Sequence, residues 1–268
     1  MLSLKEIFDV EKPIIGVVHL LPLPGSPMFD GLIDAIIKRA LSDASALVKN
    51  GVDGLIVENF GDKPFTKNRI PREGFALMSI IVKRIVDSFN VPVGVNVLRN
   101  DALSAMALAY ASGADFIRVN VYTDTMVTDQ GIIEPIAWRL LSYRRALNAD
   151  VRIFADVLVK HAKPIVDISI RDSVKTAVYR GLADALIVTG SETGAPVDID
   201  TLREAKEASG GVPVLAGSGV NLGNVAEILS LADGAIVGTF FKKDGLTENP
   251  VDGSRVKKLT SLVKKLFR

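Results

Sequence analysis

The chain has 268 residues, 32 of them basic and 31 acidic, and its net charge of +1 creates no electrostatic attraction to nucleic acid. It contains no cysteine, which excludes thiolate catalysis, cysteine-zinc sites and a disulfide-stapled secreted fold. No window approaches the roughly 18 consecutive apolar residues that a membrane helix needs, and the N-terminus lacks the apolar core of a signal peptide. We therefore expect a cytoplasmic protein without a nucleic-acid partner or an integral membrane segment.

Short apolar runs rich in β-branched residues alternate with helical patterns along the chain. Such alternation favours a parallel sheet covered by helices. Eight runs favour a (β/α)₈ TIM barrel, because a doubly wound sheet would usually show about five to seven strands. The expected strands are 14–20, 54–59, 92–98, 116–122, 152–158, 185–190, 213–219 and 234–241. We expect residues 1–268 to form one such barrel domain.

Polar residues interrupt the apolar alternation of four neighbouring strands. In 116–122, every second residue is apolar and suits packing against helices, so the polar residues between them should point into the barrel. The polar residues that this alternation turns inward are Glu58, Asn96, Arg118, Asn120 and Asp156. We predict a catalytic constellation at the mouth, because a core built for stability alone would hold branched apolar side chains. The alternative is a mutually satisfied network, with Arg118 paired to Asp156 or Glu58, that serves only the core.

The chemistry of these acids stays open at the level of sequence. Glu58 and Asp156 either act as general acid and base or hold one Mg²⁺ with help from the asparagines. Lys160 and His161 follow the fifth strand, where a loop at the mouth is expected. The lysine would meet a substrate phosphate or, if desolvated, a carbonyl, and the histidine would transfer protons, unless both are simply solvated. Only two histidines exist, which excludes a histidine-rich zinc site.

Small and hydroxylated residues follow the sixth, seventh and eighth expected strands. In (β/α)₈ enzymes a phosphate group is frequently held by the loops after strands seven and eight, where backbone N–H groups face the anion. We predict a phosphate site there, with Lys242 as a nearby counter-charge, although glycine-serine pairs are also common in ordinary tight turns. The residues predicted to line it are Thr189, Gly190, Ser191, Gly217, Ser218, Gly219, Gly238 and Thr239.

Several longer segments are distinctive as a set, among them "GVVHLLPLPGSP", "VENFGDKPF", "FIRVNVYTDTMVTDQGIIE", "ADVLVKHA" and "DALIVTGSETGAPVD". In these segments the chain resembles the BtpA family, over nearly its whole length. The resemblance implies a TIM barrel of the ribulose-phosphate-binding type. It also implies a name taken from photosystem I biogenesis, which describes a cellular role rather than a reaction. The polar residues singled out above fall on matching motif positions, without established roles.

Three functions are compatible with these observations. The first is an enzyme, expected as a homo-oligomer, that acts on a small phosphorylated metabolite by isomerase, lyase or hydrolase chemistry. The second is a noncatalytic biogenesis or assembly factor for a membrane protein complex, as the family name suggests. The third is a barrel that senses a metabolite without turnover. The fold alone does not separate them, because barrels of this kind host unrelated chemistries.

Overall fold

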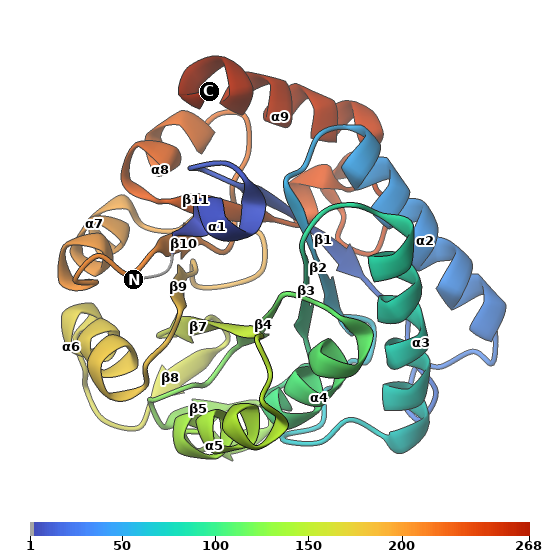
Figure 1. The fold of residues 1–268 in the computed structure, drawn as a ribbon, viewed down its shortest axis with the longest axis horizontal. Helices are drawn as coiled ribbons and strands as arrows, with labels where there is room; N and C mark the ends of the chain where they lie inside the picture. Colours follow the sequence, from blue (N-terminus) through green and yellow to red (C-terminus); the bar gives the residue numbers. More distant parts are fainter. Residues whose placement is uncertain (1–2) are drawn as a thin grey trace.

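The computed structural model describes residues 3–268, in which eight parallel strands close into a barrel surrounded by helices (Figure 1). In chain order the barrel strands are β1 (Ile14–His19), β2 (Gly54–Glu58), β3 (Val93–Asn96), β4 (Phe116–Val119), β7 (Arg152–Val157), β9 (Ala185–Val188), β10 (Val214–Ala216) and β11 (Gly234–Val237). Each strand pairs in parallel with the next, and β11 closes the ring on β1. The predicted (β/α)₈ barrel is confirmed.

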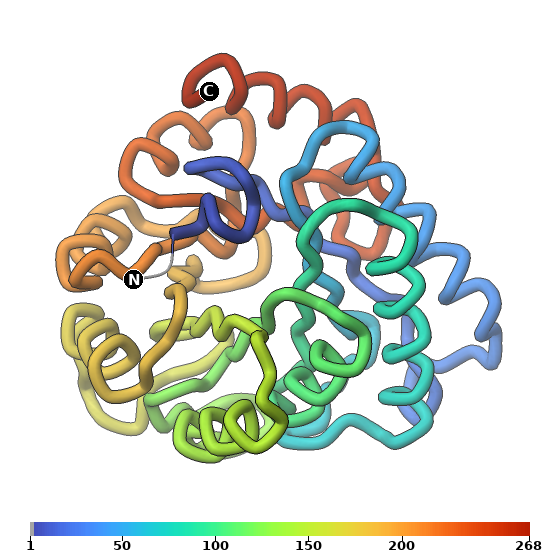
Figure 2. The backbone as a smooth tube through the Cα atoms, viewed as in Figure 1, coloured from blue at the N-terminus to red at the C-terminus, as the bar shows by residue number. Residues whose placement is uncertain are grey.

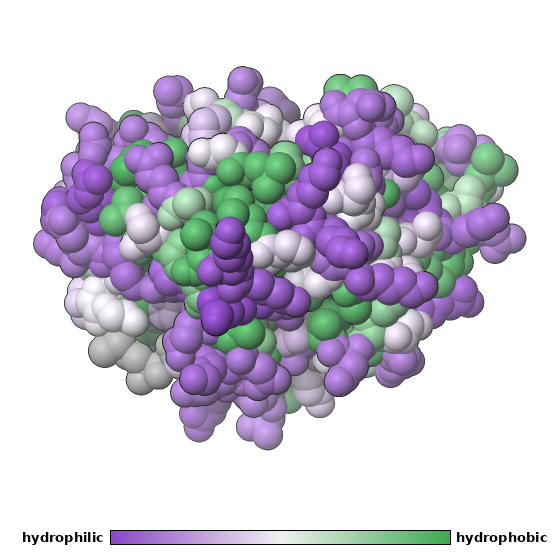
Figure 3. All heavy atoms as spheres, turned by 90° about the horizontal axis from the view of Figure 1, so that it is seen from above, coloured by the Kyte–Doolittle hydropathy of each residue, from purple (hydrophilic) through white to green (hydrophobic). Residues whose placement is uncertain are grey.

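Helices pack around the outside of this barrel. They are α2 (Ile33–Lys49), α3 (Arg72–Ser88), α4 (Ala102–Ser112), α5 (Ala137–Leu147), α6 (Ile170–Lys175), α7 (Ile199–Ala208), α8 (Val225–Leu231) and α9 (Gly253–Phe267). The basic helix α9 buries Val256, Leu259 and Val263, and the face of the molecule seen in Figure 3 is mostly hydrophilic, with several apolar areas, the broadest left of its centre. Across residues 3–268, no helix combines the length and the apolar character needed to cross a membrane.

Side chains alternate along the strands between two apolar layers. Leu55 and Val57 belong to the layer between strands and helices, whereas Ile56 lies with Phe116 and Phe154 inside the barrel. This is the alternation predicted from the sequence, and it sends the polar residues of the same strands into the barrel.

The N-terminal end of the barrel is closed by the short helix α1 (Leu4–Phe8), which lies across the middle of the ring (Figure 2). The ring of Phe8 stands edge-on to Phe116 and Phe154, with centroid distances of 5.8 and 6.5 Å. Gly94 makes room for this cluster, because a Cβ there would lie 2.2 Å from the ring of Phe116. This closure was not expected from the sequence.

A second, three-stranded sheet lies beside the barrel mouth. It contains β6 (Gly131–Ile133), β5 (Met126–Thr128) and β8 (Ala162–Pro164), paired antiparallel in that order. The sheet joins the loop after β4 to the loop after β7, over a small apolar core of its own. It was not expected from the sequence, and it fixes one side of the rim of the mouth.

We expect Phe8→Ala to lower the free energy of unfolding by about 3–5 kcal/mol, because it removes the ring that fills the barrel end. Urea unfolding of both proteins measures the difference. Tyr110→Ala is the matched control, since the Tyr110 side chain is largely exposed and its loss should change stability by less than about 0.5 kcal/mol. Equal losses in the two variants would contradict the role of Phe8 as a plug.

Candidate active site at the barrel mouth

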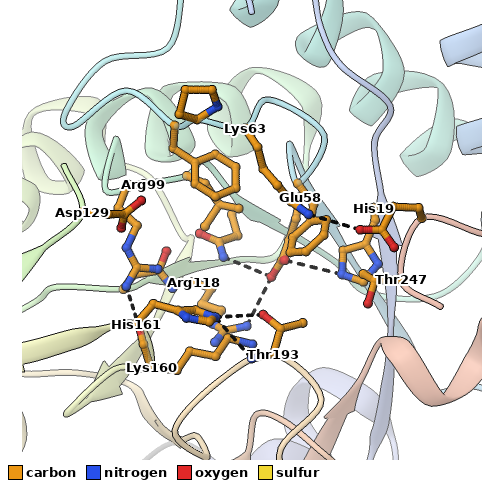
Figure 4. A pocket seen from close by; sticks show the side chains of 17 residues that line it. His19, Glu58, Lys63, Arg99, Arg118, Asp129, Lys160, His161, Thr193 and Thr247 are labelled. Atoms are coloured by element: carbon orange, nitrogen blue, oxygen red, sulfur yellow. Dashed lines mark hydrogen bonds and ion pairs between the residues drawn. The ribbon is translucent and has the colours of Figure 1, made fainter. Parts of the chain in front are cut away.

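A cavity of about 820 Å³ opens at the C-terminal ends of the strands. The structure brings six of the predicted catalytic residues to its wall: Glu58, Asn96, Arg118, Asn120, Lys160 and His161. Figure 4 shows Glu58 between His19 and Arg118, with Lys160 and His161 reaching in from the loop after β7. Phe60, Phe65 and Leu98 supply apolar wall between these charges.

The guanidinium of Arg118 is the centre of the polar network. Its Nε and Nη2 donate to the two carboxylate oxygens of Asp156 at 2.9 and 3.0 Å, and its Nη1 donates to Glu58 Oε1 at 3.2 Å. Asn96 donates to the same Glu58 oxygen at 3.0 Å, and Asn120 donates to Asp156 at 2.9 Å. All five residues are buried, and the two carboxylates raise the pKa of Arg118 against the opposing effect of burial. A guanidinium shared by two carboxylates stays charged.

The two carboxylates have different surroundings. Asp156 is fully enclosed, both of its oxygens are occupied by Arg118 and Asn120, and it does not reach the wall of the cavity. The expectation that Asp156 acts as general acid or base is therefore not supported by the geometry, and we assign it a positioning role. Glu58 does reach the cavity, and its Oε2 accepts no hydrogen bond from residues 3–268. Glu58 is thus the acid–base candidate.

The expected Mg²⁺ site between Glu58 and Asp156 does not fit this arrangement. The positive guanidinium of Arg118 occupies the place between the carboxylates and uses three of their four oxygens. A divalent cation would have to displace it, at a large electrostatic penalty. In the described part of the chain, no group of three or more acidic or histidine side chains has an arrangement suited to a metal ion.

The network in this site partly matches the alternative that the sequence left open. Arg118 does pair with both Asp156 and Glu58, as a purely structural network would require. Three buried atoms of residues that line the cavity nevertheless have no hydrogen-bond partner within residues 3–268, namely Asn120 Oδ1, His19 Nδ1 and Arg99 Nε. Buried polar atoms are normally satisfied, so unpaired ones beside a cavity point to a ligand rather than to stability alone.

His19 is a site residue that the sequence analysis placed at the end of a strand without giving it a role. Its Nε2 lies 3.8 Å from Glu58 Oε2, and its ring packs against Phe60 at 4.8 Å between centroids. Burial, reinforced by Lys242, Lys160, Lys63 and Arg118, holds the pKa of His19 well below its ordinary value. The imidazole is neutral at pH 7. The alternation along β1 was a usable signal, because Val17, two residues earlier, also points into the barrel.

Lys160 and His161 lie on a tightly held turn after β7. The backbone N–H of Lys160 donates to Thr189 Oγ1 at 3.1 Å, and its carbonyl accepts from Arg99 Nη2 at 2.7 Å. Burial and the neighbouring charge of Arg118 lower the pKa of Lys160 to about 8. His161 is exposed at the rim, where its Nε2 accepts from the N–H of Thr193 at 3.2 Å. Both predicted residues reach the cavity, and Lys160 is the more buried of the two.

The predicted phosphate cradle corresponds to a small cavity of about 30 Å³ that adjoins the large one. The two cavities share the walls formed by His19, Glu58, Arg118, Lys160 and Thr193. The small cavity is also lined by the predicted residues Gly217, Ser218, Gly219, Gly238 and Thr239. Within the described chain, no oxygen accepts a hydrogen bond from the backbone N–H groups of Ser218 and Gly219. Free N–H groups beside cationic side chains are the elements of an anion site.

The loop after β9 makes contacts that were not predicted from the sequence. Thr189 caps the Lys160 N–H, the Gly190 N–H donates to the Ser218 hydroxyl at 2.7 Å, and Ser191 faces a separate side cavity. The Ser218 hydroxyl in turn donates to Ala195 at 2.9 Å, so it fastens this loop instead of facing an anion. Thr189, Gly190 and Ser191 line the side cavity, and their expected contact with a phosphate stays a prediction; they are absent from the wall of the small cavity. Thr193 and Gly194, further along the same loop, take that place.

Lys242 does not lie at the cradle. It is completely buried, and its Nζ donates to Asp43 Oδ2 at 3.0 Å. Asp43, in α2, also accepts from Arg39 and from the Val251 N–H. The buried pair therefore ties the chain after β11 to α2, and Lys160 stands beside the small cavity as its cationic side chain instead.

Charged residues also surround the outer rim of the large cavity. Lys63, from the loop after β2, pairs with Glu248, after β11, at 3.2 Å, and its Nζ lies 4.2 Å from the ring centroid of Phe60. Arg99 is buried at the opposite wall, and its Nε has no partner among the described residues. Arg99 was not assigned to the site from the sequence, because it follows its strand in a loop whose path has no local pattern.

Fold and site together define a (β/α)₈ barrel with a polar, charged cavity at the C-terminal mouth, where enzymes of this architecture carry their active sites. The chain belongs to the BtpA family, whose model matches residues 10–265. An uncharacterized protein of Thermococcus kodakarensis is 49% identical and spans 95% of this chain and 96% of its own. The photosystem I biogenesis protein BtpA of Synechocystis sp. is 47% identical, over 95% of this chain and 89% of its own.

Solved structures agree on the fold at low sequence identity. The N-(5'-phosphoribosyl)anthranilate isomerase of Pyrococcus furiosus superposes with a TM-score of 0.52 at 12% identity, covering 95% of this chain and 99% of its own. KGPDC of Streptococcus mutans gives a TM-score of 0.58 at 12% identity, covering 96% and 99%. At these identities the similarity shows the barrel and nothing of its chemistry.

We expect Lys242→Met to lower the free energy of unfolding by about 3 kcal/mol, because it leaves the Asp43 carboxylate buried without its ammonium partner. Urea unfolding measures this. The double variant Lys242→Met with Asp43→Leu should recover part of the loss, since it removes both charges. If Lys242 faced a ligand, Lys242→Met would instead change ligand affinity and leave stability intact.

Proposed function

We propose that the protein is an enzyme that binds a small phosphorylated metabolite at the barrel mouth and acts on it by isomerase, lyase or hydrolase chemistry. The observation that carries this proposal is the direct junction of the two cavities. The small one offers free N–H groups, and the wall that it shares with the large one carries Lys160, Glu58 and His19. A phosphate seated in the small cavity would hold the rest of the molecule against the acid–base pair.

Each side chain of the site has a separate role in the proposed reaction. Glu58, with one oxygen free and one fixed by Arg118 and Asn96, removes or returns a proton. Arg118 and the neutral imidazole of His19 stabilise negative charge that develops on substrate oxygen. Asp156 holds Arg118 in place. The cytoplasmic location and the homo-oligomeric state expected from the sequence stay predictions.

Ligand-induced stabilisation tests the phosphate site. We expect inorganic phosphate and a panel of phosphosugars to raise the melting temperature, while the unphosphorylated sugars do not. At a hundredfold excess over Kd, a bound ligand adds about 2.7 kcal/mol to the free energy of unfolding. Gly238→Ala should abolish the shift, because its Cβ would lie 2.8 Å from the His19 ring at the small cavity. Gly223→Ala, at an exposed turn, is the matched control and should keep it. A shift that survives Gly238→Ala would place the phosphate elsewhere.

A second candidate function is a noncatalytic role in assembling a larger complex, which the name of the Synechocystis relative suggests. An apolar groove of about 560 Å³ between α3, α4 and α5 is compatible with it, since Trp138 stands 79% exposed beside Phe75 and Leu103. Relatives from the nematode Caenorhabditis elegans and the archaeon Methanocaldococcus jannaschii also match over nearly the whole chain. The unpaired buried atoms of His19, Arg99 and Asn120 belong to residues that line the mouth cavity and not this groove, which favours the enzyme.

Complementation of a strain that lacks the gene separates the two functions. If the protein is an enzyme, Glu58→Gln should fail to complement and should leave phosphorylated metabolites at the level of the deletion strain, because the proposed base is gone. Trp138→Ala should complement, since it leaves the cavity untouched. The reverse result, with Glu58→Gln active and Trp138→Ala inactive, would favour the assembly factor. Mass spectrometry of cell extracts supplies the readout.

A further inference from the structure

We propose that Lys160 is a covalent catalyst, whose amine condenses with an aldehyde or ketone of the phosphorylated substrate to form an imine. This inference rests on the proposed function and narrows its substrate class to phosphorylated carbonyl compounds. It also narrows the chemistry, because an imine draws electrons from a neighbouring C–H or C–C bond, as isomerases and lyases require.

The position of Lys160 is the first argument. It lines the large cavity, the small cavity and a side cavity of about 600 Å³, and so stands at the point where the three meet. Within residues 3–268, no carboxylate or other acceptor bonds its Nζ. The buried Lys242, by contrast, is held by Asp43. A half-buried amine without an ion-pair partner is suited to react and is costly to keep for stability alone.

The backbone around Lys160 is the second argument. Leu158 and His161 both adopt left-handed conformations, with φ of 47° and 56°, although neither is glycine. Each such residue costs on the order of 1 kcal/mol, and strain of this kind persists where surrounding contacts enforce it, often at functional sites. Here Thr189 holds the Lys160 N–H and Arg99 holds its carbonyl. The turn is thus forced into the shape that presents this side chain to the cavities.

The charge environment is the third argument. Burial and Arg118 lower the pKa of Lys160 to about 8, from an ordinary value of 10.5. At pH 7.5 roughly a quarter of the amine would then be neutral, against roughly a thousandth for an ordinary exposed lysine. Only the neutral amine has the lone pair that attacks a carbonyl.

The step balances without any co-reactant. The lone pair of Nζ forms a bond to the carbonyl carbon, and the C=O π pair moves to oxygen. Glu58, whose free Oε2 faces the same cavity, takes a proton from the nitrogen and delivers it to the oxygen, giving a carbinolamine. Loss of water, with the second N–H proton leaving on the departing hydroxyl, yields the imine. No oxidant or reductant is consumed.

Reductive trapping tests this inference on the intact protein. Pyridoxal 5′-phosphate, which carries an aldehyde and a phosphate, is added at pH 7.5, the C=N bond is reduced with borohydride, and labelled peptides are mapped by mass spectrometry. We expect Lys160 to be labelled about tenfold faster than the exposed Lys163 of the nearby strand β8, with a rate that rises through about pH 8. Inorganic phosphate should slow labelling of Lys160 and not of Lys163.

Two variants provide controls. Lys160→Arg removes the amine and should abolish labelling at this position, whereas Lys163→Met should leave the labelling of Lys160 unchanged. Labelling spread over surface lysines with Lys160 unmodified overturns the inference, and the wild-type map alone decides this if a variant does not fold. A thermal shift with phosphosugars but no trapping at Lys160 overturns the imine and spares the proposed function. Loss of both the shift and the phosphate protection overturns the proposed function itself.

Discussion

The burial of one guanidinium, that of Arg118, is the constraint on which the barrel mouth depends. A charge taken out of water is tolerated only when its donors are satisfied by partners of opposite charge, and here Asp156 does this from the adjacent strand β7 and Glu58 from β2, two strands away. The same contacts decide which atoms remain available. They use both oxygens of Asp156 and one of Glu58, so the free acceptor of the network faces the cavity.

This network also links the two ends of the site. Arg118 reaches the wall of both cavities, so its charge acts on any anion seated near Ser218 and Gly219 as well as on groups near Glu58. Its field is one reason why Lys160 loses its proton more readily than an ordinary lysine. Removing one member of such a cluster alters the others, and single substitutions there report on the whole unit.

The barrel and its inward polar residues were predictable from the sequence because strand geometry repeats every two residues. Once Ile117 and Val119 are assigned to the helix-facing side, Arg118 has only one direction left, and Glu58 follows in the same way. The loops follow no such rule. No local pattern shows that Lys242 turns towards Asp43, 199 positions earlier. The loop after β9 folds back on itself, with Ala195 and Pro196 against Gly190 and with Gly190 bonded to Ser218, through contacts that exist only in the folded protein. The plug formed by Phe8 was missed for the same reason, because a five-residue helix carries little periodic pattern.

The ion pair between Lys63 and Glu248 spans the rim of the cavity and bears on the rate at which small molecules enter it. Both side chains are largely in water, with exposures of 48% and 71%, and a pair of that kind contributes about 0–1 kcal/mol. The pair therefore contributes little to holding these two loops together, whereas the backbone hydrogen bonds of the β6–β5–β8 sheet stiffen another part of the rim. Small molecules would enter the cavity between the loops of Lys63 and Glu248. Added salt, by screening the pair, would make these loops easier to separate and would speed the exchange of ligand between cavity and solvent.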